Sequence, residues 1–279
     1  MKIQAVIDAL KHETDPENKV SPKSIDQLII GNPENEVRGI VVTFMATVDV
    51  IKSAIAEGSN FIITHEPTWF NGHDQTAWLE QNETFQDKKR LILDNDITIW
   101  RFHDHMHFAK HDLIMNGFAQ QLGWQRFLKP GDTNGKNILE QSELCFDLSG
   151  ETTLEQVLLR LKQCLNLHAI RYIGNPNQKV RKIAGLVGGG SLGLGDERNP
   201  IELMADKNID LAICGDITEW TLSAYIRDCN MLGINKSMVV IGHERSEEFG
   251  MKYLVSLVEK LTNIKTAFID ANEPFDYYI

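Results

Sequence analysis

The chain has 279 residues, of which 42% are hydrophobic, so it can bury one large core or two modest ones. Its formal net charge of -11 argues against nucleic acid as a partner, because phosphate binding needs a basic face. No apolar run approaches the roughly 20 residues of a membrane helix, and the four cysteines form no C-x-x-C pair, so we expect a cytoplasmic protein with reduced thiols and no membrane contact.

The first half of the chain predicts alternating helices and strands. The expected elements are a helix over 1–12, a strand over 37–44, a helix that opens at Thr47, a strand over 60–64, a helix over 76–94, a strand over 97–102, and a helix from Phe108 to Leu122. Thr47 is a plausible N-cap because its hydroxyl can accept a hydrogen bond from the first helical turn. The stretch 129–141 is rich in loop-forming residues and predicts a domain boundary.

The second half repeats this alternation. The expected elements are a strand over 144–148, a helix from a capping box at Thr152 and Glu155 to about Leu165, strands over 168–173 and 180–187, a short helix that opens at Asn199-Pro200, a strand over 210–214, a helix over 219–229, a strand over 237–241, a helix through Leu254 to Leu261, and a strand over 264–269. Such alternation predicts an α/β fold with a largely parallel sheet covered by helices.

Polar residues follow four of the expected strands, after positions 64, 102, 214 and 241. In open α/β sheets, ligands bind beyond the carboxyl ends of the strands, where loops from neighbouring strands converge. We therefore expect these four strand ends to lie on one side and to form one polar site.

The first of these strand ends contains His65 and Glu66. Pro67 prevents the strand from continuing, as expected where a buried strand presents ligands at its end. We expect His65 to bind a metal ion, and Glu66 to be either a second ligand or the base that takes a proton from water. Trp69 lies nearby in the sequence and is a candidate for substrate binding.

The second strand end contains His103, His105 and His107. Alternate residues of an extended chain face the same way, so the three imidazoles are expected on one side and Asp104 on the other. Imidazole nitrogens suit zinc, iron, nickel or manganese. His103 and His107 are candidate metal ligands and His105 is a candidate for proton transfer; the alternative is a surface loop of hydrogen-bonded histidines.

The other two strand ends contain Asp216 and the pair His243 and Glu247. His243 and Glu247 are four residues apart at the start of an expected helix, so both can reach one ion from the same helix face. Asp216 is a candidate substrate ligand, with an outer partner of the metal site and a turn-forming residue as alternatives. The glycine run over 188–195 permits a close backbone approach, either for an anion or for a tight strand connection.

These donors exceed what one tetrahedral ion requires. Two divalent transition-metal ions a few ångströms apart would use them all. We therefore expect a dinuclear centre that contains zinc, iron, manganese or nickel.

At these residues the chain resembles the NIF-three-like family, named after the NGG-interacting factor, whose bacterial members are called GTP cyclohydrolase 1 type 2 homologues. Four motifs match in order over essentially the whole chain. Residues 62–67 resemble the family's I-T-H-H-P, residues 102–107 its A-H-T-N-L-D, residues 214–217 its T-G-[ED], and residues 242–247 its G-H-x-x-[ST]-E.

The resemblance implies a metal-ligand set of His65, Glu66, His107, His243 and Glu247. Two of these positions depart from the family pattern, because Glu66 replaces a histidine and His107 replaces an aspartate. The two replacements together leave the number of ligands and their net charge unchanged, so the site is expected to have exchanged donor types.

The resemblance also implies two interlinked α/β lobes with mostly parallel sheets, with the metal site at the C-terminal ends of strands in the cleft between them. We place the first lobe at 1–128 plus 236–279 and the second at 129–235. A ring-shaped homohexamer is expected on the same grounds.

Together these features predict a dinuclear-metal-dependent hydrolase that acts on a nucleotide-like or phosphorylated small molecule, similar to GTP cyclohydrolase 1 type 2. One ion would activate water and the other would orient the substrate, while Glu66 or His105 moves protons. The alternative is a metal-binding interaction protein or metallochaperone without turnover.

Overall fold

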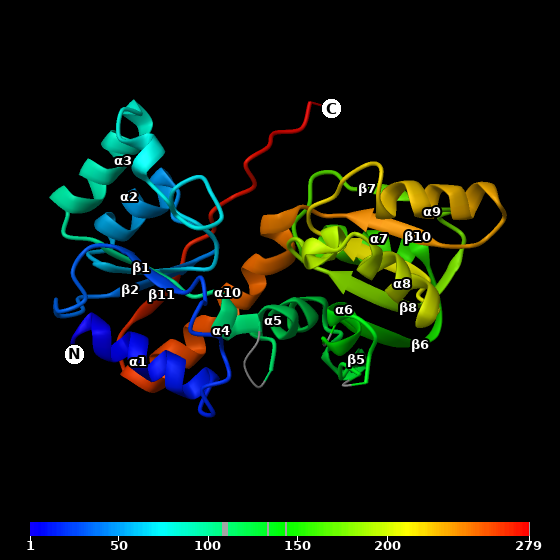
Figure 1. Ribbon diagram of the computed structural model, residues 1–279, viewed down its shortest axis with the longest axis horizontal. Coiled ribbons are helices and arrows are strands. Elements are labelled where there is room, and N and C mark those ends of the chain that lie inside the picture. The colour runs from blue at the N-terminus through cyan, green and yellow to red at the C-terminus, as the bar shows by residue number, and fades with distance from the viewer. Residues whose placement is uncertain (108–110, 133, 143, 279) are drawn as a thin grey trace. The chain divides into compact units, whose positions relative to one another are not determined.

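The computed structural model describes residues 1–107, 111–132, 134–142 and 144–278. The chain is a mixed α/β protein with two sheets, and its contacts divide it into two compact units (Figure 1). Unit 1 comprises Met1–Ile114 and Gly250–Asn272, and unit 2 comprises Met115–Phe249 and Glu273–Ile279. The boundaries expected after residues 128 and 235 both fall inside unit 2.

The sheet of unit 1 has the strand order β1-β4-β3-β2-β11. Its strands are β1 (Gln27–Ile30), β2 (Ile40–Thr43), β3 (Phe61–Thr64), β4 (Thr98–Arg101) and β11 (Thr266–Phe268). Its helices are α1 (Ile3–Thr14), α2 (Val48–Ala56), α3 (Glu83–Asp94) and the single turn α4 (Asp104–His107), and a 3₁₀ turn spans Ala77–Leu79. β4, β3, β2 and β11 are parallel, and β1 pairs antiparallel with β4 at the edge.

Every residue of β2, β3 and β4 is buried, as expected for parallel strands that helices cover on both faces. α2 and α3 lie on one face of this sheet and α1 lies on the other (Figure 1). Val41, Ile62 and Ile99 are neighbours across three strands and share a core cluster with residues of α2 and α3. The parallel register also places the carboxyl ends of β3 and β4 side by side.

The sheet of unit 2 has the strand order β5-β6-β8-β9-β10-β7. Its strands are β5 (Leu128–Lys129), β6 (Cys145–Thr153), β7 (Arg171–Ile173), β8 (Lys179–Leu186), β9 (Leu211–Cys214) and β10 (Ser237–Val240). Its helices are α6 (Ile138–Gln141), α7 (Leu154–Cys164), α8 (Arg198–Asp206) and α9 (Leu222–Met231), with 3₁₀ turns at Gln125–Phe127 and Gly190–Gly195. Two further helices, α5 (Leu113–Leu122) and α10 (His243–Thr262), contain residues of both units.

The expectation of a mostly parallel sheet is wrong for unit 2. Only β8, β9 and β10 are parallel among its described strands, while the pairs β5/β6, β6/β8 and β7/β10 are antiparallel. The connection between β7 and β8, residues 174–178, is too short to form the helical crossover that a parallel return requires. β7 therefore runs against β8, β9 and β10.

Three local expectations also need correction. The capping box of α7 is formed by Thr153 and Gln156, one residue later than expected. α8 begins at Arg198, so Asn199 and Pro200 lie in its first turn rather than at its N-cap. The strand β1 was not expected, and Phe108, expected to open a helix, lies outside the described residues.

In the described part of the chain, no helix is both long enough and apolar enough to cross a membrane.

Replacement of Thr47 by alanine is expected to lower the free energy of unfolding by about 1 kcal/mol. The side chain of Thr47 accepts a hydrogen bond from the backbone N–H of Val50 at 3.2 Å, as expected for the N-cap of α2. The measurement is the urea midpoint of the unfolding transition. Thr47→Ser keeps the hydroxyl and should unfold like the wild type; an equal loss in both variants would assign the effect to the lost methyl group instead.

Candidate metal centre

Three histidines converge at the carboxyl ends of β3 and β4 in unit 1. His65 follows β3 and is fully buried, while His103 precedes the turn α4 that follows β4 and His107 is its last residue. Nε2 of His65 lies 3.2 Å from Nε2 of His107, and the rings of His65 and His103 stack with centroids 4.4 Å apart. One ring nitrogen from each of the three lies within 4.8 Å of the others.

The opposite ring nitrogen of each histidine is hydrogen-bonded to an oxygen. Nδ1 of His65 lies 3.3 Å from the carbonyl oxygen of Phe102, Nδ1 of His103 lies 2.9 Å from Asp104, and Nδ1 of His107 lies 3.1 Å from Asp112. A carbonyl or carboxylate oxygen can only accept, so Nδ1 carries the proton and Nε2 presents its lone pair. An outer partner on the second nitrogen is typical of metal-binding histidines.

The pKa shifts of His103 and Asp104 agree with a neutral imidazole whose Nδ1–H donates to an ionised carboxylate. Burial, together with the neighbouring His65, lowers the pKa of His103, so its imidazole is neutral at neutral pH. Burial acts to raise the pKa of Asp104, but the neighbouring His103 side chain and the hydrogen bonds from Ile25 and Ser24 together outweigh it and lower that pKa to about 2. Asp104 is therefore an ionised acceptor for the N–H of His103.

These contacts fit a divalent transition-metal ion. The Nε2 atoms of His65 and His107 both direct lone pairs into the space between them, an arrangement that is repulsive unless a cation or proton lies there. Three neutral imidazoles are a donor set that zinc, iron and nickel accept.

Asp26, which precedes β1, holds the turn that contains these histidines. Its carboxylate is 1% exposed and accepts backbone N–H bonds from His103 and Asp104 at 2.6 Å and from His105 at 3.2 Å. Burial acts to raise the pKa of Asp26, but hydrogen bonds from the His105 ring and these backbone groups lower it. A further bond joins the same two segments, because the carboxylate of Asp104 accepts a hydrogen bond at 3.2 Å from the backbone N–H of Ile25, the residue before Asp26. The sequence pattern gives no sign of this role of Asp26, because the backbone groups that it binds lie 77–79 residues further along the chain.

The expectation that His103, His105 and His107 face one side is wrong. Residues 104–107 form a helical turn rather than an extended chain, so residues four apart share a face. His105 instead binds Asp26 through Nδ1 at 2.5 Å and lines a separate cavity of about 430 Å³ in unit 1, beside His12 and Asp26. The structure therefore places the expected proton-transfer residue away from the three-histidine group.

Glu66 lies beside the three-histidine group. One carboxylate oxygen is 3.6 Å from Nε2 of His103, and the other is 3.3 Å from the guanidinium of Arg101. The Arg101 side chain is 3% exposed and also donates to the carbonyl oxygens of His65 and Gly72. Arg101 therefore fixes the orientation of the Glu66 carboxylate relative to the backbone of His65.

Trp69 is not available to a substrate, contrary to expectation. Its indole is 2% exposed and packs edge-on against Phe85, with ring centroids 4.9 Å apart. The tryptophan belongs to the hydrophobic core that α2 and α3 form on the sheet of unit 1.

A second group of donors lies within unit 2. Nε2 of His243, at the start of α10, is 3.0 Å from a carboxylate oxygen of Glu247, one turn later. Nδ1 of His243 lies 2.8 Å from Asp216, which follows β9. Because the Asp216 carboxylate accepts the Nδ1 proton, Nε2 and the Glu247 oxygen both direct lone pairs into one space, which fits a cation. Of the alternatives for Asp216, the geometry favours the outer partner of a ligand.

Gly188, at the start of the glycine run, lies against this second group. A Cβ atom on Gly188 would approach a carboxylate oxygen of Glu247 to 2.0 Å and Nε2 of His243 to 3.0 Å, and the residue has a φ of +51°. Its backbone N–H donates to the hydroxyl of Ser246 at 2.9 Å. The close backbone approach expected of the glycine run therefore occurs beside His243 and Glu247.

Comparison with known proteins identifies related sequences over most of the chain. A sequence profile of the family described as Duf34/NIF3 (NGG1p interacting factor 3) matches residues 1–274. A Clostridium acetobutylicum protein called GTP cyclohydrolase 1 type 2 homolog is 26% identical over 222 residues, which cover 79% of this chain and 76% of that protein. A Clostridium perfringens protein of the same name is 24% identical over 262 residues, which cover 90% of each chain.

Solved structures share the fold. A Staphylococcus aureus protein superposes with a TM-score of 0.74 at 20% sequence identity, covering 100% of this chain and 99% of that one. A Bacillus cereus protein related to NIF3 superposes with a TM-score of 0.73 at 18% identity, with the same coverage.

Replacement of Asp26 by asparagine is expected to weaken metal binding about 10- to 100-fold. Asparagine keeps the shape of the side chain, but it removes the charge and turns an N–H donor toward the N–H groups of residues 103–105. The measurement is titration of metal-free protein with Co²⁺, followed by visible absorption. Asp94→Asn, at an exposed position of α3, is the matched control; an Asp26→Asn protein with wild-type affinity would contradict the role of Asp26.

Proposed function

The chain belongs to the Duf34/NIF3 family, and from this premise we propose that it is a metal-dependent hydrolase that acts on a nucleotide-like or phosphorylated small molecule. The observation that carries the proposal is the convergence of His65, His103 and His107, each with Nδ1 bonded to an oxygen and with one ring nitrogen within 4.8 Å of a ring nitrogen of the other two. The name GTP cyclohydrolase 1 type 2 homolog, which clostridial relatives bear, supports a nucleotide-like substrate.

We propose that the chain binds two divalent transition-metal ions. The three imidazoles of unit 1 and the imidazole and carboxylate of His243 and Glu247 in unit 2 provide nitrogen and oxygen donors that suit zinc, iron, manganese or nickel. Asp104, Asp112 and Asp216 would keep the ligand rings in the tautomer that binds metal.

The chemistry follows from this arrangement. Divalent ions held by these ligands would lower the pKa of a bound water and polarise the substrate bond that is cleaved. Glu66 is the residue that we assign to proton transfer, because one of its oxygens lies 3.6 Å from Nε2 of His103, within the group. Arg101 binds the other oxygen of Glu66, so the carboxylate stays oriented while it accepts the proton from water and delivers it to the leaving group.

Elemental analysis of purified protein should detect roughly two transition-metal ions per chain, as in two-metal hydrolases. His107→Ala and Glu247→Ala each remove one donor, so both variants should lose metal. His168→Ala changes an exposed histidine of unit 2 and should retain the wild-type content. Wild-type content in both ligand variants would contradict the assignment.

Metal-loaded protein should hydrolyse one member of a panel of GTP and sugar phosphates, and removal of the metal should abolish turnover. Glu66→Gln is expected to retain its metal and to lose turnover by about 10²- to 10⁴-fold, because glutamine cannot accept the proton. Metal loss in Glu66→Gln would make Glu66 a ligand rather than the base. Absence of turnover over the whole panel by a fully loaded protein would favour a binding protein.

A further inference from the structure

Phe70 presents an exposed aromatic ring in the loop that follows Glu66. The loop connects β3 to the 3₁₀ turn at Ala77–Leu79, and Phe70 is 56% exposed, whereas the preceding Trp69 is 2% exposed. Four residues of chain span at most about 14 Å, so the Cα atoms of Glu66 and Phe70 lie within that distance of each other. The exposed ring is therefore a neighbour of the residue to which we assign proton transfer, in the same unit.

The backbone of Phe70 has a left-handed conformation, with a φ of +62°. This conformation is unfavourable for a bulky side chain and persists only where surrounding contacts impose it. Of the nine described non-glycine residues with a positive φ, seven are asparagine or aspartate, which tolerate it readily. Phe70 is not of this kind, and such outliers concentrate at binding and active sites.

Polar side chains fix the backbone on both sides of Phe70. The carboxylate of Asp74, whose side chain is 3% exposed, accepts the backbone N–H of Thr68 at 2.8 Å and that of Trp69 at 2.7 Å. The side-chain amide of Asn71 donates to the carbonyl oxygen of Trp69 at 2.9 Å. The ring of Phe70 takes no part in these bonds, so the loop holds the ring in place without depending on it.

The guanidinium of Arg101 connects this loop to Glu66. It lies 3.3 Å from the carboxylate of Glu66, donates to the carbonyl oxygen of Gly72 at 2.7 Å, and lies 3.8 Å from the carboxylate of Asp74. Phe70 lies between Glu66 and Gly72 in the sequence, so one buried group fixes the chain on either side of it. A substrate bound at Glu66 therefore finds Phe70 in a constant position.

A buried ammonium lies over one side of the ring. Nζ of Lys88, on α3, is 5.4 Å from the ring centroid of Phe70 and donates to the carbonyl oxygen of Thr68 at 2.9 Å. Burial lowers the pKa of Lys88 to about 8, so the group is still mostly charged at neutral pH and is attracted to the π face of the ring. Lys88 is 5% exposed, so it approaches the ring from inside the protein and leaves the solvent side open.

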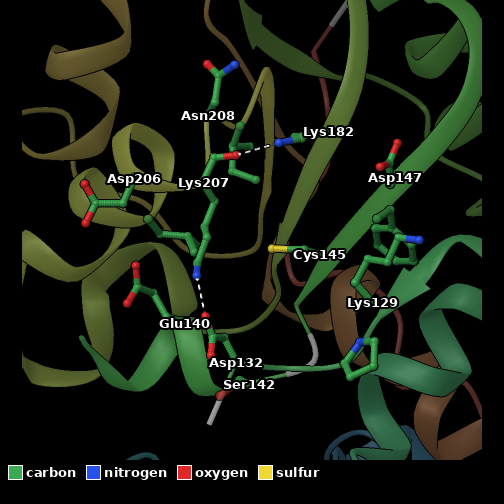
Figure 2. Close-up of a pocket in the computed structure, with 14 residues that line it drawn as sticks. Lys129, Asp132, Glu140, Ser142, Cys145, Asp147, Lys182, Asp206, Lys207 and Asn208 are labelled. Atoms are coloured by element: carbon green, nitrogen blue, oxygen red, sulfur yellow. Dashed lines mark hydrogen bonds and ion pairs between the residues drawn. The ribbon is translucent and has the colours of Figure 1, made fainter. Parts of the chain in front are cut away.

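Two cavities of the protein offer no comparable surface. A cavity of about 370 Å³ in unit 2 is lined mainly by charged and polar side chains, among them Lys207, which is paired with Asp132 at 2.9 Å (Figure 2). Phe146, the one aromatic residue among its described lining residues, is 1% exposed. The cavity beside His105 has no phenylalanine, tyrosine or tryptophan among its described lining residues. Neither cavity can stack on the planar ring of a ligand as Phe70 can.

We propose that Phe70 is a specificity-determining residue that stacks on a planar aromatic ring of the substrate, such as a nucleobase, while the rest of the substrate extends toward Glu66 and the three-histidine group. This inference rests on the proposed function, since it concerns the same site. It narrows that function to nucleotide-like substrates, because a sugar phosphate has no planar ring to stack. Every base has a π face, so Phe70 selects the class of substrate rather than the individual base.

The test is calorimetric titration of the full-length protein, in the presence of Zn²⁺, with GMP and with ribose 5-phosphate, which has the same sugar and phosphate but no base. The wild type should bind GMP more tightly. Phe70→Ala should weaken GMP binding about 5- to 150-fold and leave ribose 5-phosphate binding unchanged, while Phe70→Trp should keep the preference for GMP. A disturbed loop would weaken both ligands, so the ratio of the two affinities isolates the stacking contact.

Phe127→Ala is the matched control. Phe127 is a half-buried residue of unit 2 and also has a cation beside its ring, because the guanidinium carbon of Arg126 lies 4.6 Å from the ring centroid. This variant should bind both ligands as the wild type does.

A second measurement reports the stacking in the wild-type protein. The H8 proton of GMP should move upfield in the proton NMR spectrum as protein is added, because it lies in the ring current of Phe70, and Phe70→Leu should abolish the shift. The proposal is overturned if the wild type binds GMP and ribose 5-phosphate equally, or if Phe70→Ala weakens both by the same factor. Hydrolysis of sugar phosphates without any preference for GMP would leave the proposed function intact and reject the role of Phe70; a Phe70-dependent preference for GMP without turnover of any substrate would do the reverse.

Discussion

The candidate metal centre of unit 1 depends on the hydrogen bonds that hold the Nδ1 atoms of three histidines. Each bond ends on an oxygen that can only accept, so each ring has a defined tautomer and a defined orientation. These bonds orient the rings of His65 and His107 so that their Nε2 atoms lie 3.2 Å apart. The centre also depends on the parallel pairing of β3 with β4, because this pairing brings the strand ends that precede His65 and His103 side by side.

Asp26 connects this centre to the edge of the sheet. One buried carboxylate binds three consecutive backbone N–H groups and the ring of His105, so the turn that contains His103 and His107 is fixed from outside the group. A buried carboxylate is favourable only when its charge is compensated by hydrogen bonds, and four donors provide this compensation. In unit 2, the carboxylate of Asp216 likewise orients a histidine, His243, through its Nδ1 atom. Gly188 has no side chain, and this leaves room for the carboxylate of Glu247.

The departures from the family pattern have local explanations in the structure. Glu66, which stands where the resemblance expects a histidine, has the guanidinium of Arg101 at 3.3 Å to compensate its charge. His107, which stands where an aspartate is expected, has Asp112 on its second nitrogen. In both cases the exchanged donor is accompanied by a residue that suits its charge or its proton.

The sequence alone determined the features that depend on neighbours a few residues apart: the buried strands that end at Thr64 and Arg101, the N-cap at Thr47, and the spacing of His243 and Glu247. Contacts between residues far apart in the sequence decided which of the candidate side chains lie together and which are buried elsewhere. The turn at 104–107 separates His105 from its neighbours because Asp26 binds its backbone, and Trp69 is buried because α3 packs over it. Strand periodicity cannot reveal such contacts, because it reports only which face of its own element a residue occupies.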